Sequence, residues 1–169
     1  MKINIFIIIL LSAIVFSSCD KGLAPVEQKI NQGPSYLKGK ITYLGGIPKW
    51  PSDTSAFPPK DIRIVAFKTY PPSKDIFTEI STGNAYFSDP LLKFVDSDSF
   101  TLKIPNPPVL IKYLVLAQNH GDLLQWRPIG FYKLKNTDTI PAIISVASGD
   151  TVWGLNITVD WENLPKMPF

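Results

Sequence analysis

The sequence has little of the chemistry on which most catalytic and metal sites depend. Its 169 residues include one cysteine, Cys19, and one histidine, His120. One cysteine excludes a disulfide within the chain, and these two side chains are too few for a zinc site. The nucleophile motif Gly-x-Ser-x-Gly does not occur, so a serine hydrolase built on that strand-to-helix turn has no candidate. The absences argue against an enzyme, a metal and any other cofactor.

Charge is sparse and balanced. The chain has 17 Lys and Arg against 14 Asp and Glu, and no basic patch stands out, so no nucleic-acid partner is predicted. All 16 prolines follow Cys19. This argues against a helical bundle and for short segments joined by turns.

One long apolar run is present, at the N-terminus. Lys2 precedes an almost unbroken apolar stretch from Ile5 to Phe16, and two serines stand directly before Cys19. The run has about 12 residues, fewer than the roughly 20 that cross a bilayer as a helix. This layout is typical of a cleavable signal peptide.

The same segment resembles a bacterial lipoprotein signal, in which the cysteine at the cleavage point is acylated and becomes the first mature residue. Phe16 stands where leucine is commoner, and the resemblance is to the lipoproteins of Bacteroidota-like bacteria. It implies lipidation of Cys19, a membrane partner reached through that lipid, and a place in the cell envelope, at the outer membrane in preference to the inner. Each buried CH₂ of the acyl chains would contribute about 0.8 kcal/mol to the attachment.

The rest of the chain divides into a tether and one domain. Asp20 to Pro34 shows no sustained period, which favours a flexible linker. The expected organisation is a signal peptide at 1–18, the lipidated Cys19 with its tether at 19–34, and a single β domain at 35–169.

Strand patterns fill the predicted domain. Apolar and polar residues alternate over 36–44 and 100–104, and 110–117 is apolar enough for a central strand. Further strands are predicted at 62–70, 129–134, 142–146 and 152–159, with a weaker one at 76–80. Residues 148–150 suggest a hairpin turn between the last two main strands. No segment shows a convincing amphipathic helix. The predicted fold is all-β, an antiparallel β-sandwich of about seven or eight strands.

A family resemblance supports this fold. The order Leu37-x-Gly39-x-Ile41-x-Tyr43, Ile62-x-Ile64-x-Ala66, Phe100-x-Leu102-x-Ile104-Pro105 and Tyr113-x-Val115-x-Ala117 resembles the transthyretin-like, or carboxypeptidase-regulatory-like, β-sandwich. An immunoglobulin-like sandwich is the neighbouring possibility. Modules of this kind are usually noncatalytic, which is what the resemblance implies here.

Aromatic side chains give the main binding candidates. Trp50, Trp126 and Arg127 lie outside the clearest strand patterns, so we expect them to be exposed and able to stack on a sugar or a partner side chain. Trp153 and Trp161 lie in or beside a predicted strand, where core packing explains them.

Three aspartates close together in the sequence are expected to lie in turns. Asp89, Asp96 and Asp98 lie close together in the sequence, but their spacing does not match an EF-hand. Local hydrogen bonding in turns is the favoured interpretation, and a loop calcium site stays open.

The sequence therefore predicts a noncatalytic, envelope-anchored module that binds a glycan, a peptide or a partner protein. A structural or accessory envelope lipoprotein without its own ligand is the alternative. A hydrolase with its site on the loops comes third, because paired carboxylates converge in space and not in sequence.

Overall fold

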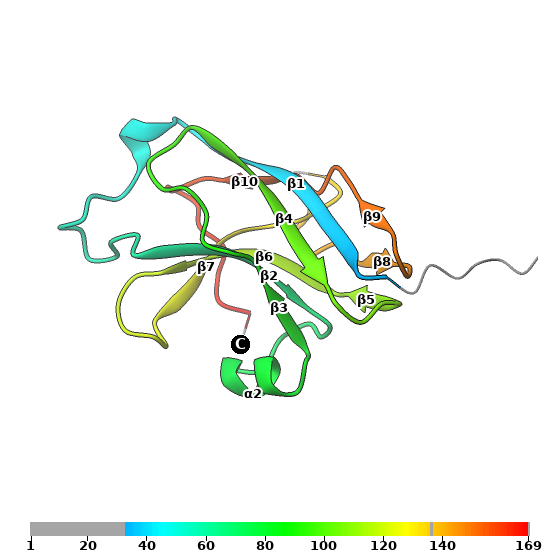
Figure 1. Ribbon diagram of the computed structural model, residues 1–169. Helices are drawn as coiled ribbons and strands as arrows, with labels where there is room; N and C mark the ends of the chain where they lie inside the picture. Colours follow the sequence, from blue (N-terminus) through cyan, green and yellow to red (C-terminus); the bar gives the residue numbers. More distant parts are fainter. Residues whose placement is uncertain (1–32, 136, 169) are drawn as a thin grey trace, which may run out of the picture. The chain divides into compact units, whose positions relative to one another are not determined.

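The computed structural model describes residues 33–135 and 137–168 (Figure 1). The predicted signal peptide, the predicted lipidation site Cys19 and most of the predicted tether lie outside the described residues. Within the described ranges, no helix has the length and apolar character needed to cross a membrane.

The regular structure of the described chain is mostly β-strand and forms three sheets. The first sheet has the order β10-β1-β4, with β9 also paired to β1; the second has the order β3-β2-β6-β7; β5 and β8 form the third. The strands are β1 (Ser35–Tyr43), β2 (Asp61–Phe67), β3 (Ala85–Phe87), β4 (Ser97–Ile104), β5 (Val109–Ile111), β6 (Tyr113–Asn119), β7 (Trp126–Phe131), β8 (Ile144–Val146), β9 (Thr151–Val152) and β10 (Ile157–Val159). Two short helices, η1 (Ile47–Lys49) and α2 (Ile76–Ser81), lie in the connections.

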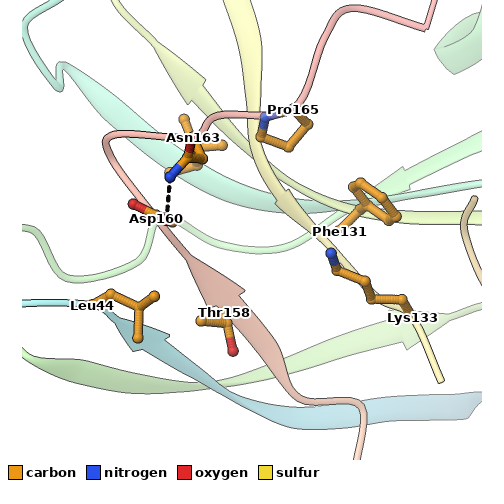
Figure 2. A pocket seen from close by; sticks show the side chains of 8 residues that line it. Leu44, Phe131, Lys133, Thr158, Asp160, Asn163 and Pro165 are labelled. Carbon is orange, nitrogen blue, oxygen red and sulfur yellow. Dashed lines mark hydrogen bonds between the residues drawn. The ribbon is translucent and has the colours of Figure 1, made fainter. Parts of the chain in front are cut away.

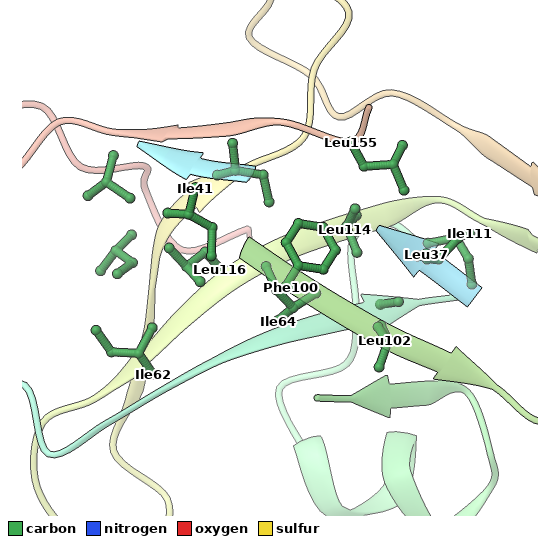
Figure 3. Packing of buried hydrophobic residues seen from close by; sticks show 14 of the residues in the cluster. Leu37, Ile41, Ile62, Ile64, Phe100, Leu102, Ile111, Leu114, Leu116 and Leu155 are labelled. Carbon is green, nitrogen blue, oxygen red and sulfur yellow. The ribbon is translucent and has the colours of Figure 1, made fainter. Parts of the chain in front are cut away.

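The two larger sheets contribute to one buried cluster (Figure 3). Leu37 and Phe100 reach it from β1 and β4, while Ile64 and Leu116 reach it from β2 and β6. The alternation predicted for 36–44 is confirmed, since Leu37, Ile41 and Tyr43 are buried between exposed or half-buried neighbours. Burial of this apolar face is the main force that holds the sheets together.

The pairing is not entirely antiparallel. β1 pairs with β4 antiparallel but with β9 and β10 parallel. The hairpin predicted at 148–150 is therefore wrong: β8 pairs with β5, while β9 joins β1 in another sheet. Tight turn chemistry at Ser148-Gly149-Asp150 is compatible with a change of sheet as well as with a hairpin.

The apolar run predicted as one strand at 110–117 is divided between two sheets. Residues up to Ile111 pair with β8, and residues from Tyr113 pair with β2 and β7. The division falls at Lys112, whose N–H donates to the Phe67 carbonyl. The central strand itself is confirmed, because β6 lies between β2 and β7 and all of its residues are buried.

The weak strand predicted at 76–80 is wrong, because these residues form α2. The carboxylate of Asp75 accepts the N–H groups of Phe77 and Thr78 and the hydroxyl of Thr78. This N-cap satisfies backbone donors that a short helix otherwise leaves unpaired. The cap outweighs the β-branched composition of the segment.

The strand predicted at 152–159 is interrupted. Between β9 and β10 the Leu155 N–H donates to the Lys38 carbonyl, and the Asn156 side chain accepts the Lys40 N–H. Gly154 has φ of +75°, a conformation that suits glycine. Trp153, expected in the core, is 68% exposed as a result of this break.

Candidate functional site

The structure places Trp50 in the core and not on the surface. Its side chain is 7% exposed and its ring centroid lies 4.4 Å from Tyr43 and 5.1 Å from Trp161. The indole Nε1 donates to the Val95 carbonyl at 2.9 Å. The expectation that Trp50 is exposed is wrong, because residues distant in sequence fold over it. Trp161, expected to pack, is half-buried against the same cluster.

Trp126 and Arg127 lie within β7 and point to opposite faces of the sheet. Trp126 pairs with Asn119 and Arg127 with Gln118, and consecutive strand residues alternate between faces. The indole of Trp126 donates to the Leu123 carbonyl in the neighbouring turn. The two side chains therefore do not form one site, although both are partly accessible.

Arg127 belongs to a small cluster with Phe57 and His120. Its guanidinium lies 4.4 Å from the Phe57 ring centroid and its Nε donates to Gln118 Oε1 at 2.9 Å. His120 meets the same Phe57 ring edge-on at 5.0 Å. Partial burial, and then the positive charge of Arg127, lower the pKa of His120. Arg127 and His120 both pack against Phe57. His120 lies beside the turn after β6, as expected.

The neighbouring aspartates serve the turns. Asp96 Oδ1 accepts the Ile47 N–H at 2.9 Å, and the two carboxylate oxygens of Asp98 accept the N–H groups of Leu92 and Ser99. Local hydrogen bonding is thus found for Asp98, which lies at the start of β4, whereas the Asp96 carboxylate bonds a backbone N–H from a distant part of the chain. In the described part of the chain, Asp89 and these two residues do not belong to any group of three or more potential metal ligands.

A groove runs along the end of β7, and we call it the β7 groove. It consists of two adjoining pockets of about 280 and 430 Å³ that share Phe131, Lys133, Asn163 and Pro165. Figure 2 shows the first of them, between β7, β10 and the segment that follows β10. Tyr70, Tyr113 and Asp138 line the second pocket. Segments far apart in sequence thus meet at one concave surface.

A β-bulge determines which side of β7 faces this groove. Ala117 pairs with Pro128 but Leu116 pairs with Gly130, so Ile129 is an extra residue in β7. The bulge directs both Ile129 and Gly130 toward the core and returns Phe131 to the outer face. There the Phe131 ring lies 6.1 Å from that of Tyr113, which in turn lies 5.3 Å from Tyr70.

Glycine at 130 allows the groove's two walls to approach. A Cβ at this position would lie 2.8 Å from Ile157 Cγ2 and 3.0 Å from the Thr158 carbonyl oxygen. β7 therefore contacts β10 without being hydrogen-bonded to it in the described sheets. The close approach brings Thr158 and Asp160 beside Phe131 and Lys133.

Side chains of both charges line the pocket to which the Phe131 ring belongs. The Lys133 ammonium lies 5.1 Å from the ring centroid. The Asp160 carboxylate accepts hydrogen bonds from the Asn163 side chain at 2.8 Å and from the Glu162 N–H at 3.0 Å. The Asn163 side chain, first, and the backbone N–H of Glu162 lower the pKa of Asp160, so this carboxylate is ionised at neutral pH.

The sequence did not reveal these residues as a site. Phe131 and Lys133 fall inside one predicted strand, and Asn163 lies beyond the last one. Only the bulge and the return of the C-terminal segment bring them together, and neither leaves a recognisable motif. The predicted residues Trp126 and Arg127 lie at the other end of β7, outside the groove's lining.

Comparison with known proteins gives no match to this chain among family models, curated proteins or solved structures.

Proposed function

We propose that this chain is a noncatalytic, lipid-anchored binding module of a bacterial cell envelope, and that the β7 groove holds a glycan. The anchor rests on the signal-peptide pattern that ends at Cys19. The outer membrane is the proposed location, and the binding role rests on the groove.

The fold proposal is a β-sandwich of the transthyretin-like or immunoglobulin-like type. Its support is the single buried cluster to which both four-stranded sheets contribute. Such scaffolds carry ligand sites on loops and sheet faces, and the site, not the fold, determines the function.

One observation carries the ligand class: the Phe131 ring lies at the junction of the two pockets, with hydrogen-bonding groups on both sides. The apolar face of a sugar ring stacks on an aromatic side chain, and its hydroxyls both donate and accept hydrogen bonds. Lys133 supplies a donor, Asp160 an acceptor, and Asn163 and Thr158 groups of both kinds. This mixture suits a polyol better than an apolar ligand.

The same geometry favours binding over hydrolysis. Asp160 is held ionised by its hydrogen bonds, and the carboxylate of Asp138 accepts the Lys135 N–H. The hydrogen bonds from Asn163 and Glu162 lower the pKa of Asp160, whereas a general acid at neutral pH needs a raised carboxyl pKa. His120 lies beside the turn at the opposite end of β7.

The test is retention of soluble envelope polysaccharide fragments by the purified chain, compared with Phe131→Ala. Phe87→Ala is the matched control, because Phe87, Val65, Val115 and Phe131 form one cross-strand row and Phe87 is 50% exposed outside the groove. We expect Phe131→Ala to weaken retention about tenfold or more, and Phe87→Ala to leave it unchanged.

Two results would contradict the binding role. If Phe131→Ala and Phe87→Ala retain the polysaccharide fragments equally, the β7 groove is not the binding site. If the purified chain retains none of the polysaccharide fragments tested, a structural or accessory role for this protein is favoured. The anchor is tested separately, by incorporation of a labelled fatty acid into the full chain and its loss in Cys19→Ser. Protease treatment of intact and lysed cells then distinguishes the cell surface from the periplasm.

A further inference from the structure

The outer face of the β10-β1-β4 sheet carries lysines on both β1 and β4. Tyr36, Lys38 and Lys40 point outward from β1, because they alternate with the buried Leu37 and Ile41 and the half-buried Gly39. Thr101 and Lys103 point outward from β4, beside Lys38 and Tyr36 respectively. We call Tyr36, Lys38, Lys40, Thr101, Lys103 and Trp153 the lysine face.

The described outward positions of β1 and β4 hold no carboxylate. The other outward residues of these strands are Thr42, Ser97 and Ser99. Acidic residues lie toward the far end of β1: Asp98 of β4 pairs with Ile41, Asp96 accepts the Ile47 N–H, and Glu162 forms an ion pair with Lys49. Near the start of β1 the turn residue Asp150 uses Oδ1 to accept the Thr151 N–H. The lysine face is thus a positive surface beside hydroxyl groups.

An exposed tryptophan borders these lysines. Trp153 is 68% exposed, and the Lys38 ammonium lies 4.7 Å from its ring centroid. Leu37 pairs with Val152, which places the next residues, Lys38 and Trp153, side by side at the edge of the face. Tryptophan and lysine together are typical of the membrane interface, where the ring lies at headgroup level and the ammonium meets phosphate.

The chain enters the domain at the same end. The carbonyl of Gly33, the first described residue, accepts the Gly149 N–H in the turn before β9, and β1 begins two residues later. The 15 residues from Cys19 to Gly33 span at most about 50 Å when fully extended. A lipid on Cys19 would therefore keep this end of the domain close to the bilayer, at a high effective concentration.

We propose that the lysine face docks on the surface of the anchoring membrane through anionic phospholipid headgroups, with Trp153 inserted at the interface. This inference rests on the proposed lipid anchor. Docking through β1 and β4 would orient the domain and leave the β7 groove open to ligand, because the groove is lined mainly by β7, the connection after it and residues 160–168, and only Thr158 of its lining lies in a strand of the β10-β1-β4 sheet.

The test measures sedimentation of the chain from residue 19, with Cys19→Ser, together with vesicles of phosphatidylglycerol and phosphatidylcholine or of phosphatidylcholine alone. Removing the lipidated cysteine separates docking from anchoring, so failure of either proposal is visible without the other. We expect binding to the anionic vesicles that is weakened by salt and weak binding to the neutral ones.

The variant Lys38→Gln/Lys40→Gln/Lys103→Gln should weaken this binding at least tenfold, since each lysine near an anionic surface contributes about fivefold. Its control is Lys74→Gln/Lys93→Gln/Lys135→Gln, which removes the same charge from exposed positions elsewhere. Trp153→Ala should weaken binding several-fold, whereas Leu123→Ala, 73% exposed in the β6–β7 turn, should not. Quenching of tryptophan fluorescence by brominated lipid should be lost in Trp153→Phe.

Unchanged melting temperatures would show that these exposed substitutions leave the fold intact. The proposal is overturned if the parent chain does not bind the anionic vesicles, or if the lysine-face and control variants lose binding equally. It is also overturned if the chain binds heparin, a soluble polyanion, but not vesicles, because the face would then recognise an anionic glycan.

Discussion

The two larger sheets share a core but present different outer faces. On the β10-β1-β4 sheet, the outward residues of β1 and β4 are exposed or half-buried lysines and hydroxyl residues. On the β3-β2-β6-β7 sheet, outward residues such as Phe67 and Tyr113 are buried, because Ile76 of α2 packs on their cluster and the C-terminal segment borders Tyr113. The same strand alternation therefore yields an open polar face in one sheet and a covered aromatic face in the other.

The difference shows what forms a concave surface on this fold. Alternation along a strand determines which residues leave the core, but the segments that return over the sheet determine whether a concave surface forms. The β7 groove exists because residues 160–168 return beside β7. Among the described residues, no segment returns over the lysine face, so this face is open to an extended partner such as a membrane surface.

The largest expected effect comes from truncating equivalent tyrosines on the two faces. Tyr113 is 4% exposed and contacts the rings of Phe67, Tyr70 and Phe131, so Tyr113→Ala should lower the free energy of unfolding by about 3 kcal/mol. Tyr36→Ala, on the open face, should cost less than about 1 kcal/mol. Urea unfolding measures both, and equal costs would contradict the contrast between the faces.

A second comparison concerns the glycines inside each sheet. At Gly39 a Cβ would lie 2.1 Å from the Leu155 carbonyl oxygen, which is backbone and cannot give way by rotation. At Gly130 the nearest atom is the Ile157 Cγ2, at 2.8 Å, which can move. We expect Gly39→Ala to destabilise by about 2–3 kcal/mol and Gly130→Ala by about 1 kcal/mol, measured by thermal unfolding. The reverse order would show that the β7–β10 approach is the tighter constraint.

Serines on the two sheets should differ by a smaller amount. Ser88 is 6% exposed, and its hydroxyl accepts the Ile64 N–H and donates to the Asp89 carbonyl. Ser88→Ala leaves a buried N–H unpaired and should cost about 1–2 kcal/mol. Ser99→Ala, on the exposed face of β4, should change stability by less than about 0.5 kcal/mol. Chemical denaturation measures the unfolding free energy of both variants. If Ser88→Ala does not lower it, water replaces the hydroxyl as the partner of the Ile64 N–H.

The smallest effect is a pH dependence from His120. Its pKa is lowered in the folded chain by burial and by Arg127, so the unfolded chain binds the proton more tightly. The stability from this group is present above the unfolded pKa, about 6.5, and is lost as the pH falls through the lower folded value. The melting temperature should fall slightly over this range, and His120→Asn should reduce the fall. An increase in stability on acidification would contradict the sign.

Much of the fold follows from local pattern. The 36–44 strand was predictable because one of its faces is wet, which leaves a clear period of two. The break between β5 and β6 within 110–117 could not be predicted from the sequence. Ile111, Tyr113 and most of their neighbours are buried, so the run shows no polar–apolar alternation. Helix α2 depends on one capping aspartate that outweighs its composition.

The site was less predictable than the fold, for a physical reason. Exposure of an aromatic residue depends on distant segments: Trp50 is covered by Phe94 and Trp161, while Trp153 is released by the break at Gly154. Phe131 faces the groove only because of the bulge at 128–130. Such determinants act across the chain and have no local signature.

The most direct test of the account compares the accessibility of the two faces in the lipidated protein on membranes. A cysteine is introduced either at Thr101, in the lysine face, or at Thr139, which is exposed and lines the β7 groove. Labelling rates with a water-soluble maleimide are measured on vesicles and again after detergent. We expect Thr101→Cys to be protected several-fold on the membrane and to become reactive in detergent, while Thr139→Cys reacts equally in both. Equal reactivity of the two positions on the membrane, or protection of Thr139→Cys instead, would contradict it.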